Sequence, residues 1–245
     1  METKTTKEPK RILLPAWLIL RGMGLLSFLR PSRGMIRDHL LQNSLVWEEF
    51  AGRLRAASKD PGQKLFLERQ DLMGNFLYGR ERKFLAKKLL GQRPLCAKEN
   101  ACEVIAVYNA LLALFQEADF PQLLSGFEAK GISLFGYFGT SFMSLKRFFA
   151  KRDVKMQVLT GKKITKEALE SGRKQGFSVC ILMAENKAGF IGEMVHTICI
   201  TKEGEIWQAH NDYEGSKNYD SLEEAVFGYH NGVSRPLGVI LLQKT

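Results

Sequence analysis

A cysteine stands where the sequence predicts the start of an apolar helix. Asn100 is a residue type that caps helices, and Glu103 is placed to complete a capping box with it. Cys102 would then be the second residue of the helix, where free backbone N–H groups and the helix dipole stabilise a thiolate and lower the pKa of the thiol. A nucleophilic cysteine needs such an environment. The same features also fit a small buried residue at a helix start, so both interpretations stay open at this point.

A histidine and two candidate partners lie further along the chain. His196 begins an apolar, strand-like run, and a histidine in a core strand needs partners for its ring nitrogens. A hairpin at 202–204 would return the chain antiparallel, so that Asn211 and Asp212 come back beside His196. A nucleophile, a base and a group that orients the base form a catalytic triad. We therefore predict that Cys102 lies within hydrogen-bond reach of His196, which Asn211 orients, with Asp212 as the alternative.

The order of these residues resembles a known family. Residues 100–111 (Asn-Ala-Cys-Glu-Val-Ile-Ala-Val-Tyr-Asn-Ala-Leu) are similar to the nucleophile helix of papain-like cysteine peptidases of the bacteriocin-leader-processing (C39-like) type. The loop 136–141, the segment 169–172 and the run 195–212 are similar to later parts of that family, in the same order. The resemblance implies a papain-like fold and a bacterial thiol protease, a hydrolase that acts on a peptide or protein substrate.

One position departs from the family pattern. Such enzymes carry a glutamine about six residues before the cysteine to donate to the oxyanion, and here that position is Cys96. Gln92 precedes Cys102 by ten residues and Asn100 precedes it by two. Either side-chain amide would be a donor beside the backbone N–H of Cys102. The departure favours an alternative, a catalytically inactive papain-like module that binds a peptide without cutting it.

Another alternative is a Cys-His-Asp acyltransferase or a transglutaminase-like enzyme on a related fold. No two cysteines are spaced as C-x-x-C, so the sequence predicts no zinc site, and nothing in it predicts a cofactor. This cysteine pattern fits a reducing compartment. His39, His210 and His230 have no partner motif and are interpreted as structural or surface residues.

The sequence predicts mostly helices in the first part of the chain and mostly strands in the last part, and these elements would position the candidate residues. Apolar residues follow a helical period in 38–57 and partly in 65–90, and 59–62 breaks the pattern. Further helices are expected at 100–114, 122–130, 140–151 and 165–174, and strands at 155–159, 177–183, 195–201, 205–211 and 237–243. Helices followed by antiparallel strands predict an α+β fold, with a helical part packed on the sheet. We expect a basic helical N-terminal extension over 1–94 and the papain-like (C39-like) peptidase domain over 95–245.

Positive charge is concentrated in the first part of the chain. Residues 1–95 hold 19 Lys and Arg against 9 Asp and Glu, whereas 96–245 hold 17 of each. Such asymmetry suggests an acidic partner for the N-terminal part, such as anionic lipid or nucleic acid, or else a solvated basic face. The apolar run 12–20 is too short to span a bilayer, which takes about 20 apolar residues.

The segment 12–35 interleaves arginines with Trp17, Leu18 and Leu25. Such a segment would lie on an anionic membrane surface, or it would pack these side chains against the rest of the protein. We therefore expect a cytoplasmic protein that is either free or peripheral to the membrane, and we predict no specific nucleic-acid site.

Overall fold

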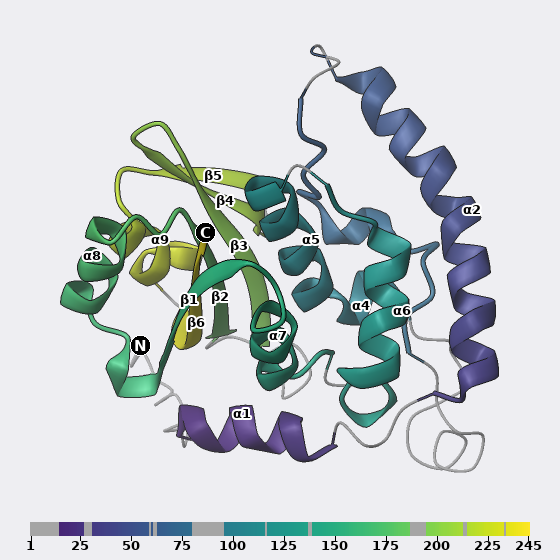
Figure 1. Ribbon diagram of the computed structural model, residues 1–245, viewed down its shortest axis with the longest axis horizontal. Helices are drawn as coiled ribbons and strands as arrows, with labels where there is room; N and C mark the ends of the chain where they lie inside the picture. Colours follow the sequence, from purple (N-terminus) through teal and green to yellow (C-terminus); the bar gives the residue numbers. More distant parts are fainter. Residues whose placement is uncertain are drawn as a thin grey trace, which may run out of the picture.

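Helices and a six-stranded sheet share the part of the chain that the structure describes. This computed structural model covers residues 15–26, 31–58, 60, 63–79, 96–115, 117–136, 139–186, 195–212, 215–232 and 234–245, apart from the side chain of His230. Helices come first along the chain, and the strands follow with two further helices among them (Figure 1). The α+β class predicted from the sequence is confirmed.

The strands of the sheet run antiparallel to their neighbours. In chain order they are β1 (Val154–Thr160), β2 (Val179–Asn186), β3 (Val195–Glu203), β4 (Ile206–Asp212), β5 (Gly215–Tyr219) and β6 (Ser234–Lys244). Their order across the sheet is β1-β6-β2-β3-β4-β5. All but β5 overlap the strands that the sequence predicts. The sequence pattern does not predict β5, because four of its five residues are glycine or polar.

The described α-helices are α1 (Ala16–Leu25), α2 (Arg33–Ala57), α4 (Ala97–Asn100), α5 (Cys102–Phe115), α6 (Phe120–Lys130), α7 (Phe142–Phe149), α8 (Lys166–Lys174) and α9 (Leu222–Phe227). Short 3-10 turns form η2 (Gln70–Met73), η3 (Leu134–Gly136), η4 (Gly161–Lys163) and η5 (Tyr229–Gly232). The hydroxyls of Ser141 and Thr165 cap α7 and α8, two helices that the sequence predicts, by accepting a backbone N–H three residues on. Ser221 caps the unpredicted helix α9 in the same way.

The sheet separates two apolar layers. Alternation along the strands turns Ile181, Cys199 and Ile240 toward the face that carries α5. Cys180 and Leu241 belong to the opposite layer, which includes α8 and α9. α5 packs chiefly on β3, and twelve of its fourteen residues are buried. The helix that begins with the candidate nucleophile is therefore the centre of the larger core.

The N-terminal helices belong to that same core. Phe50 of α2 and Phe76 are buried in one cluster with residues of α5 and α6, and Trp47 packs its ring against Phe76. α2 lies along α6, and α1 lies next to α7 (Figure 1). The described residues between 15 and 79 thus share a core with the rest of the described protein, and the expected boundary at 94 lies outside the described residues.

Two local predictions are wrong. Only the 3-10 turn η2 is helical in the described part of 65–90: residues 65–69 and 74–79 form no helix, and the prediction from residue 80 on lies outside the described residues. Asn100 does not cap the long helix, because it is the last residue of α4. The backbone N–H of Ala101 bonds to the carbonyl of Ala97 and closes a separate turn just before Cys102. A capping signal cannot reveal such a turn.

Candidate functional site

Cys102 is the first residue of α5 and is almost completely buried. Its exposed fraction is 6%, and Thr197 on β3 lies close enough to influence its thiol. Burial raises the pKa of the Cys102 thiol well above its ordinary value, the neighbouring Glu103 carboxyl raises it further, and Thr197 opposes the shift. The predicted lowering of this pKa is therefore wrong in the described conformation, because desolvation outweighs the helix dipole.

The thiol faces the point where β3 and β4 separate. Pairing between these strands runs from Cys199 opposite His210 toward the hairpin, and Thr197 precedes that paired region. Asn211 has a left-handed backbone with φ of 64°, and the register of β4 with β5 shifts close to it. Such an irregularity bends a strand away from its neighbour. The opening between the strands exposes the backbone N–H of Thr197 to the start of α5.

His196 is held through one ring nitrogen by the main chain of β4. Its Nε2 lies 2.8 Å from the carbonyl oxygen of Asn211, and the residue is 8% exposed. A carbonyl only accepts, so Nε2 must carry the proton and donate it. In the neutral ring Nδ1 is then the unprotonated nitrogen, which is the atom able to take a proton. The structure thus brings His196 and Asn211 together, but through the carbonyl of Asn211 rather than its side chain.

The side chain of Asn211 is engaged with a different segment. Its Oδ1 accepts the backbone N–H of Gln70 at 2.9 Å, and its Nδ2 donates to Oε1 of Gln70 at 3.3 Å. Nε2 of Gln70 in turn donates to the carbonyl of Lys98 in α4, at 2.8 Å. Gln70 therefore ties the end of β4 to the turn before Cys102. It precedes Asn211 by 141 residues, and no motif or spacing in the sequence indicates this contact.

Asp212, the alternative orienting residue, is the last residue of β4. It pairs with Gly215 of β5 and is 8% exposed. Burial raises the pKa of Tyr219 to about 12, and the charge of Asp212 is the next contribution in the same direction. The Asp212 carboxyl group is therefore close to Tyr219 on β5.

The two candidate oxyanion donors differ in what the structure describes of them. Asn100 is half-buried at the end of α4, two residues before Cys102. Its side-chain amide makes no hydrogen bond to another described residue. It is therefore available as a donor. Gln92 lies outside the described residues.

Glu103 places a second titratable group beside the thiol. It is 2% exposed, and its Oε2 accepts the backbone N–H of Thr140 at 3.2 Å. It therefore holds the loop before α7 and does not complete a capping box with Asn100. Burial raises the pKa of Glu103 to about 7, although hydrogen bonds from backbone N–H groups and from the Cys102 thiol oppose the shift. A Cβ at Gly139 would lie 2.5 Å from this carboxyl group, so the position requires glycine.

Glu103 should make the protein less stable as the pH rises toward neutrality. Its pKa rises from 4.5 to about 7 on folding, so between these values the folded state binds more protons than the unfolded state. The stabilisation is complete below the unfolded pKa and is lost as pH rises through the folded one. The full effect is on the order of 3 kcal/mol, because one pKa unit corresponds to about 1.4 kcal/mol.

Urea unfolding at about pH 5 and about pH 8 measures this loss. Glu103→Gln keeps an acceptor for the Thr140 N–H and should remove the difference between the two conditions. If the variant retains the wild-type pH dependence, another group is responsible.

His210 forms a buried cluster on the sheet, so the surface interpretation of this residue is wrong. It is 0% exposed, its Nδ1 lies 2.7 Å from Oε1 of Glu68, and its Nε2 lies 2.8 Å from Oγ1 of Thr201. Its ring stacks on Phe66 at 4.1 Å. Because Phe66 and Glu68 belong to the irregular segment 64–69, this cluster holds that segment on the sheet. Carboxylate, imidazole and hydroxyl also follow one another in a catalytic triad, but Thr201 is 2% exposed.

His39 is buried as well, in contact with α6. Its Nδ1 lies 2.7 Å from Oε1 of Glu128, which also accepts the backbone N–H of Gly79 at 2.7 Å. This pair links α2 to α6 inside the protein. Within the described ranges, no group of three or more His, Cys, Asp or Glu residues is arranged to hold a metal ion.

The comparisons with known proteins give no relative for this chain. No protein family matches it, and neither do any curated protein or any solved structure. The site and the fold are therefore interpreted from their own geometry.

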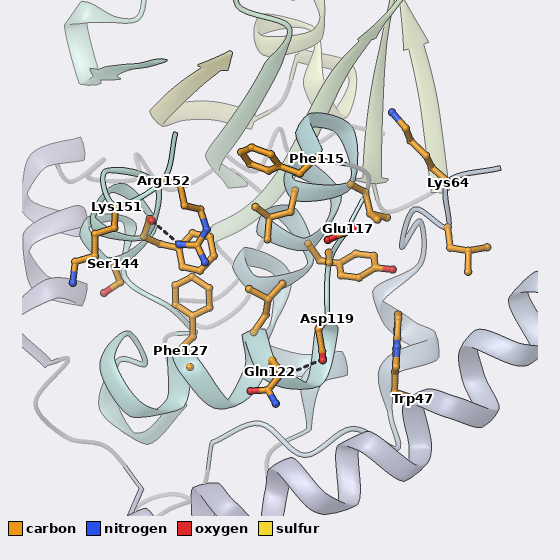
Figure 2. A pocket seen from close by; sticks show the side chains of 18 of the residues that line it. Trp47, Lys64, Phe115, Glu117, Asp119, Gln122, Phe127, Ser144, Lys151 and Arg152 are labelled. Carbon is orange, nitrogen blue, oxygen red and sulfur yellow. Dashed lines mark hydrogen bonds between the residues drawn. The ribbon is translucent and has the colours of Figure 1, made fainter. Parts of the chain in front are cut away.

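A large groove lies at the other end of α5 (Figure 2). Its volume is about 1330 Å³, and apolar side chains such as Leu111, Phe115 and Phe127 form its floor. Its charged lining residues are Arg55, Lys64, Lys130, Arg147, Lys151 and Arg152, against Glu117 and Asp119. The guanidinium carbon of Arg152 lies 3.3 Å from the ring centre of Phe148. At a rise of 1.5 Å per residue, Phe115 is about 20 Å from Cys102 along the helix.

Proposed function

We propose that this chain is a thiol peptidase with a papain-like fold, in which Cys102 is the nucleophile and His196 is its base. The observation that carries the proposal is the hydrogen bond from Nε2 of His196 to the carbonyl of Asn211. It leaves Nδ1 as the proton acceptor. Thr197, the next residue of β3, lies beside the thiol. Because neighbouring residues of a strand point to opposite faces, the proposal requires the His196 ring to turn through the opening between β3 and β4 to reach the sulfur. Nucleophilic catalysis by cysteine requires a thiol and a neighbouring base of this kind.

The proposed reaction uses these two groups in turn. The sulfur of Cys102 attacks the carbonyl carbon of a peptide bond while Nδ1 of His196 takes the thiol proton. The C–N bond breaks, the proton passes to the leaving amine, and an acyl group remains on sulfur as a thioester. Water attacks the thioester with His196 as base, which releases the carboxylic acid and restores the thiol. The backbone N–H of Cys102 and the amide of Asn100 are the proposed donors to the oxyanion.

The protonation state of the thiol shapes this mechanism. Because burial raises the pKa of Cys102, the thiol is neutral in the described conformation, and its proton leaves during the attack rather than before it. The residue is also only 6% exposed, so a reagent needs local opening to reach the sulfur. Labelling of Cys102 should therefore be slower than labelling of an exposed cysteine and should accelerate as the pH rises.

The order and packing of the elements support the papain-like fold. The helix with the nucleophile precedes the sheet, and the strand with His196 packs on that helix. This arrangement agrees with the resemblance to leader-processing peptidases carried by residues 100–111 and 195–212. Cys96, Cys102, Cys180 and Cys199 are free thiols. Free thiols fit the proposed cytoplasmic location, where they stay reduced.

A second candidate is a peptide-binding module that does not cut its ligand. The neutral, buried thiol favours it, and so does the open groove at the far end of α5 (Figure 2). Six cations and two carboxyl groups surround an apolar floor there, which suits an acidic peptide with apolar side chains. A ligand bound about 20 Å from Cys102 need not meet the thiol.

Labelling of the full chain with an iodoacetamide probe at neutral pH tests the proposal. Mass spectrometry should find the adduct on Cys102 ahead of Cys180 and Cys199, which are fully buried and whose pKa values burial raises. A mixed peptide library incubated with the protein should yield cleavage products. If an added amine is incorporated into new amides instead, the enzyme is an acyltransferase.

The peptidase proposal fails if Cys102 reacts only after unfolding and no library peptide is cut. Retention of acidic peptides under those conditions would support the binding module.

A further inference from the structure

The inner face of α1 is fixed to the protein. Leu20 and Met23 are buried in the core, and the carbonyl of Met23 accepts a hydrogen bond from the hydroxyl of Ser133 at 2.7 Å. The helix lies along the edge of the molecule, with its outer side clear of the other described elements (Figure 1). Its outer side chains are therefore held in a fixed orientation toward solvent.

The outer face of α1 carries an apolar stripe formed by Trp17, Leu18 and Leu25. These side chains are 58%, 42% and 73% exposed, so the alternative that all three are buried against the protein is wrong. At 3.6 residues per turn, the stripe and the exposed Arg21 lie within an arc of about 100°. Because this tryptophan and these two leucines are exposed to solvent, they do not gain the stabilisation that burial gives to apolar side chains in the core. Single exposed apolar residues are ordinary, but a contiguous set marks a contact surface.

Basic residues accompany the apolar stripe. Arg21 lies within it, and Lys162 and Lys163 of η4 are exposed. η4 adjoins the start of α1, because a Cβ at Gly161 would lie 3.7 Å from the Cβ of Ala16. The sequence 1–37 also holds eight Lys and Arg against two Glu. Apolar side chains next to cations are what a helix presents to the headgroup region of an anionic bilayer.

A comparison with α2 shows that charge, and not apolar exposure alone, decides the partner. Leu41 and Leu45 of α2 are 59% and 72% exposed. Within one helical turn of them lie Arg37, Asp38, Glu48 and Glu49. Three carboxylates against one cation disfavour an anionic surface, whereas no carboxylate lies on α1 itself.

We propose that α1 docks the protein on the surface of an anionic lipid bilayer, with the apolar stripe in the interface and the accompanying cations against the headgroups. α1 is ten residues long and would lie parallel to the surface. Among the described residues, no helix has the length and apolar character needed to cross a bilayer. This proposal does not depend on the chemistry of Cys102.

Co-sedimentation of the full chain with vesicles tests the proposal. At low salt the protein should bind vesicles that contain phosphatidylglycerol, should ignore pure phosphatidylcholine, and should be released by high salt. Removing the stripe in Trp17→Ser/Leu25→Ser, or the cations in Lys162→Ala/Lys163→Ala, should each lower the partition coefficient on the order of tenfold or more. The matched control Leu41→Ser/Leu45→Ser removes two leucines that are equally exposed and should bind as the wild type does.

The substituted side chains are exposed, so thermal melting should show that each variant stays folded. Three results would overturn the proposal. The wild type could ignore phosphatidylglycerol vesicles at low salt, or the α2 control could lose binding as strongly as the stripe variant. Analytical ultracentrifugation could also show a dimer that the stripe variant abolishes, without any binding to vesicles, which would assign the stripe to self-association.

Discussion

Replacing Cys102 with alanine or His196 with glutamine should lower the rate of peptide hydrolysis by at least about 10³-fold. Alanine removes the sulfur that forms the thioester. Glutamine removes the base, yet its amide still donates to the carbonyl of Asn211, which Nε2 of the wild-type ring meets at 2.8 Å. The loss in His196→Gln would then report on proton transfer rather than on local structure. Because the two residues act in one step, the double variant should be little slower than either single variant.

Cys180→Ala is the matched control for the cysteine. Cys180 is 0% exposed, but it belongs to the layer of α8 and α9 on the opposite face of the sheet. It should therefore retain the wild-type kcat/KM in the same peptide assay. Wild-type turnover by His196→Gln would remove His196 from the mechanism, and full activity of Cys102→Ala would show that the hydrolysis is not thiol chemistry.

Replacing His39 with alanine should lower the free energy of unfolding by about 3–5 kcal/mol. Glu128 is 0% exposed. In the described part of the chain, its Oε1 is hydrogen-bonded to the His39 ring and to the backbone N–H of Gly79. Its Oε2 has no hydrogen-bond partner in the described part of the chain. Without the imidazole, the Glu128 carboxyl group stays buried and loses one of its hydrogen-bond partners. A buried polar group that lacks a partner lowers the free energy of unfolding, whether the proton of the pair was on His39 or on Glu128.

Denaturant unfolding followed by circular dichroism measures this effect. Arg53→Ala on the same helix serves as the control, because Arg53 and Glu49 form an exposed ion pair at 3.9 Å, and such pairs contribute little to stability. If His39→Ala costs no more than Arg53→Ala, Glu128 remains satisfied without the imidazole.

The parts of the fold that could be predicted from sequence are those set by local pattern. Every residue of β2 from Val179 to Asn186 is buried, and its continuous apolar run 179–184 marks a core strand. The starts of α7 and α8 follow from Ser141 and Thr165, because a hydroxyl at that position bonds to the backbone of the first turn. The polar strand β5 carries no such pattern, and tertiary contacts override the helical pattern of the irregular segment 64–69.

The candidate site was only partly accessible from sequence. Hairpin geometry predicts that the chain at Asn211 returns beside His196, because the register of paired strands is a local property. The link through Gln70 joins residues 141 positions apart, and no local rule indicates it. The direction of the pKa shift at Cys102 could not be predicted from the sequence either. A helix start lowers the pKa of a thiol only while water reaches it, and burial depends on how β3 packs on α5.

The contact between His196 and the carbonyl of Asn211 has a consequence for which amino acids position 211 can accept. The group that orients the ring belongs to the main chain, and a residue with φ of 64° presents it. Glycine, asparagine and aspartate adopt this conformation most readily, whereas a β-branched residue is strained in it. A related chain with glycine at this position would keep the imidazole oriented, although a search for an amide or carboxylate side chain would judge its triad incomplete.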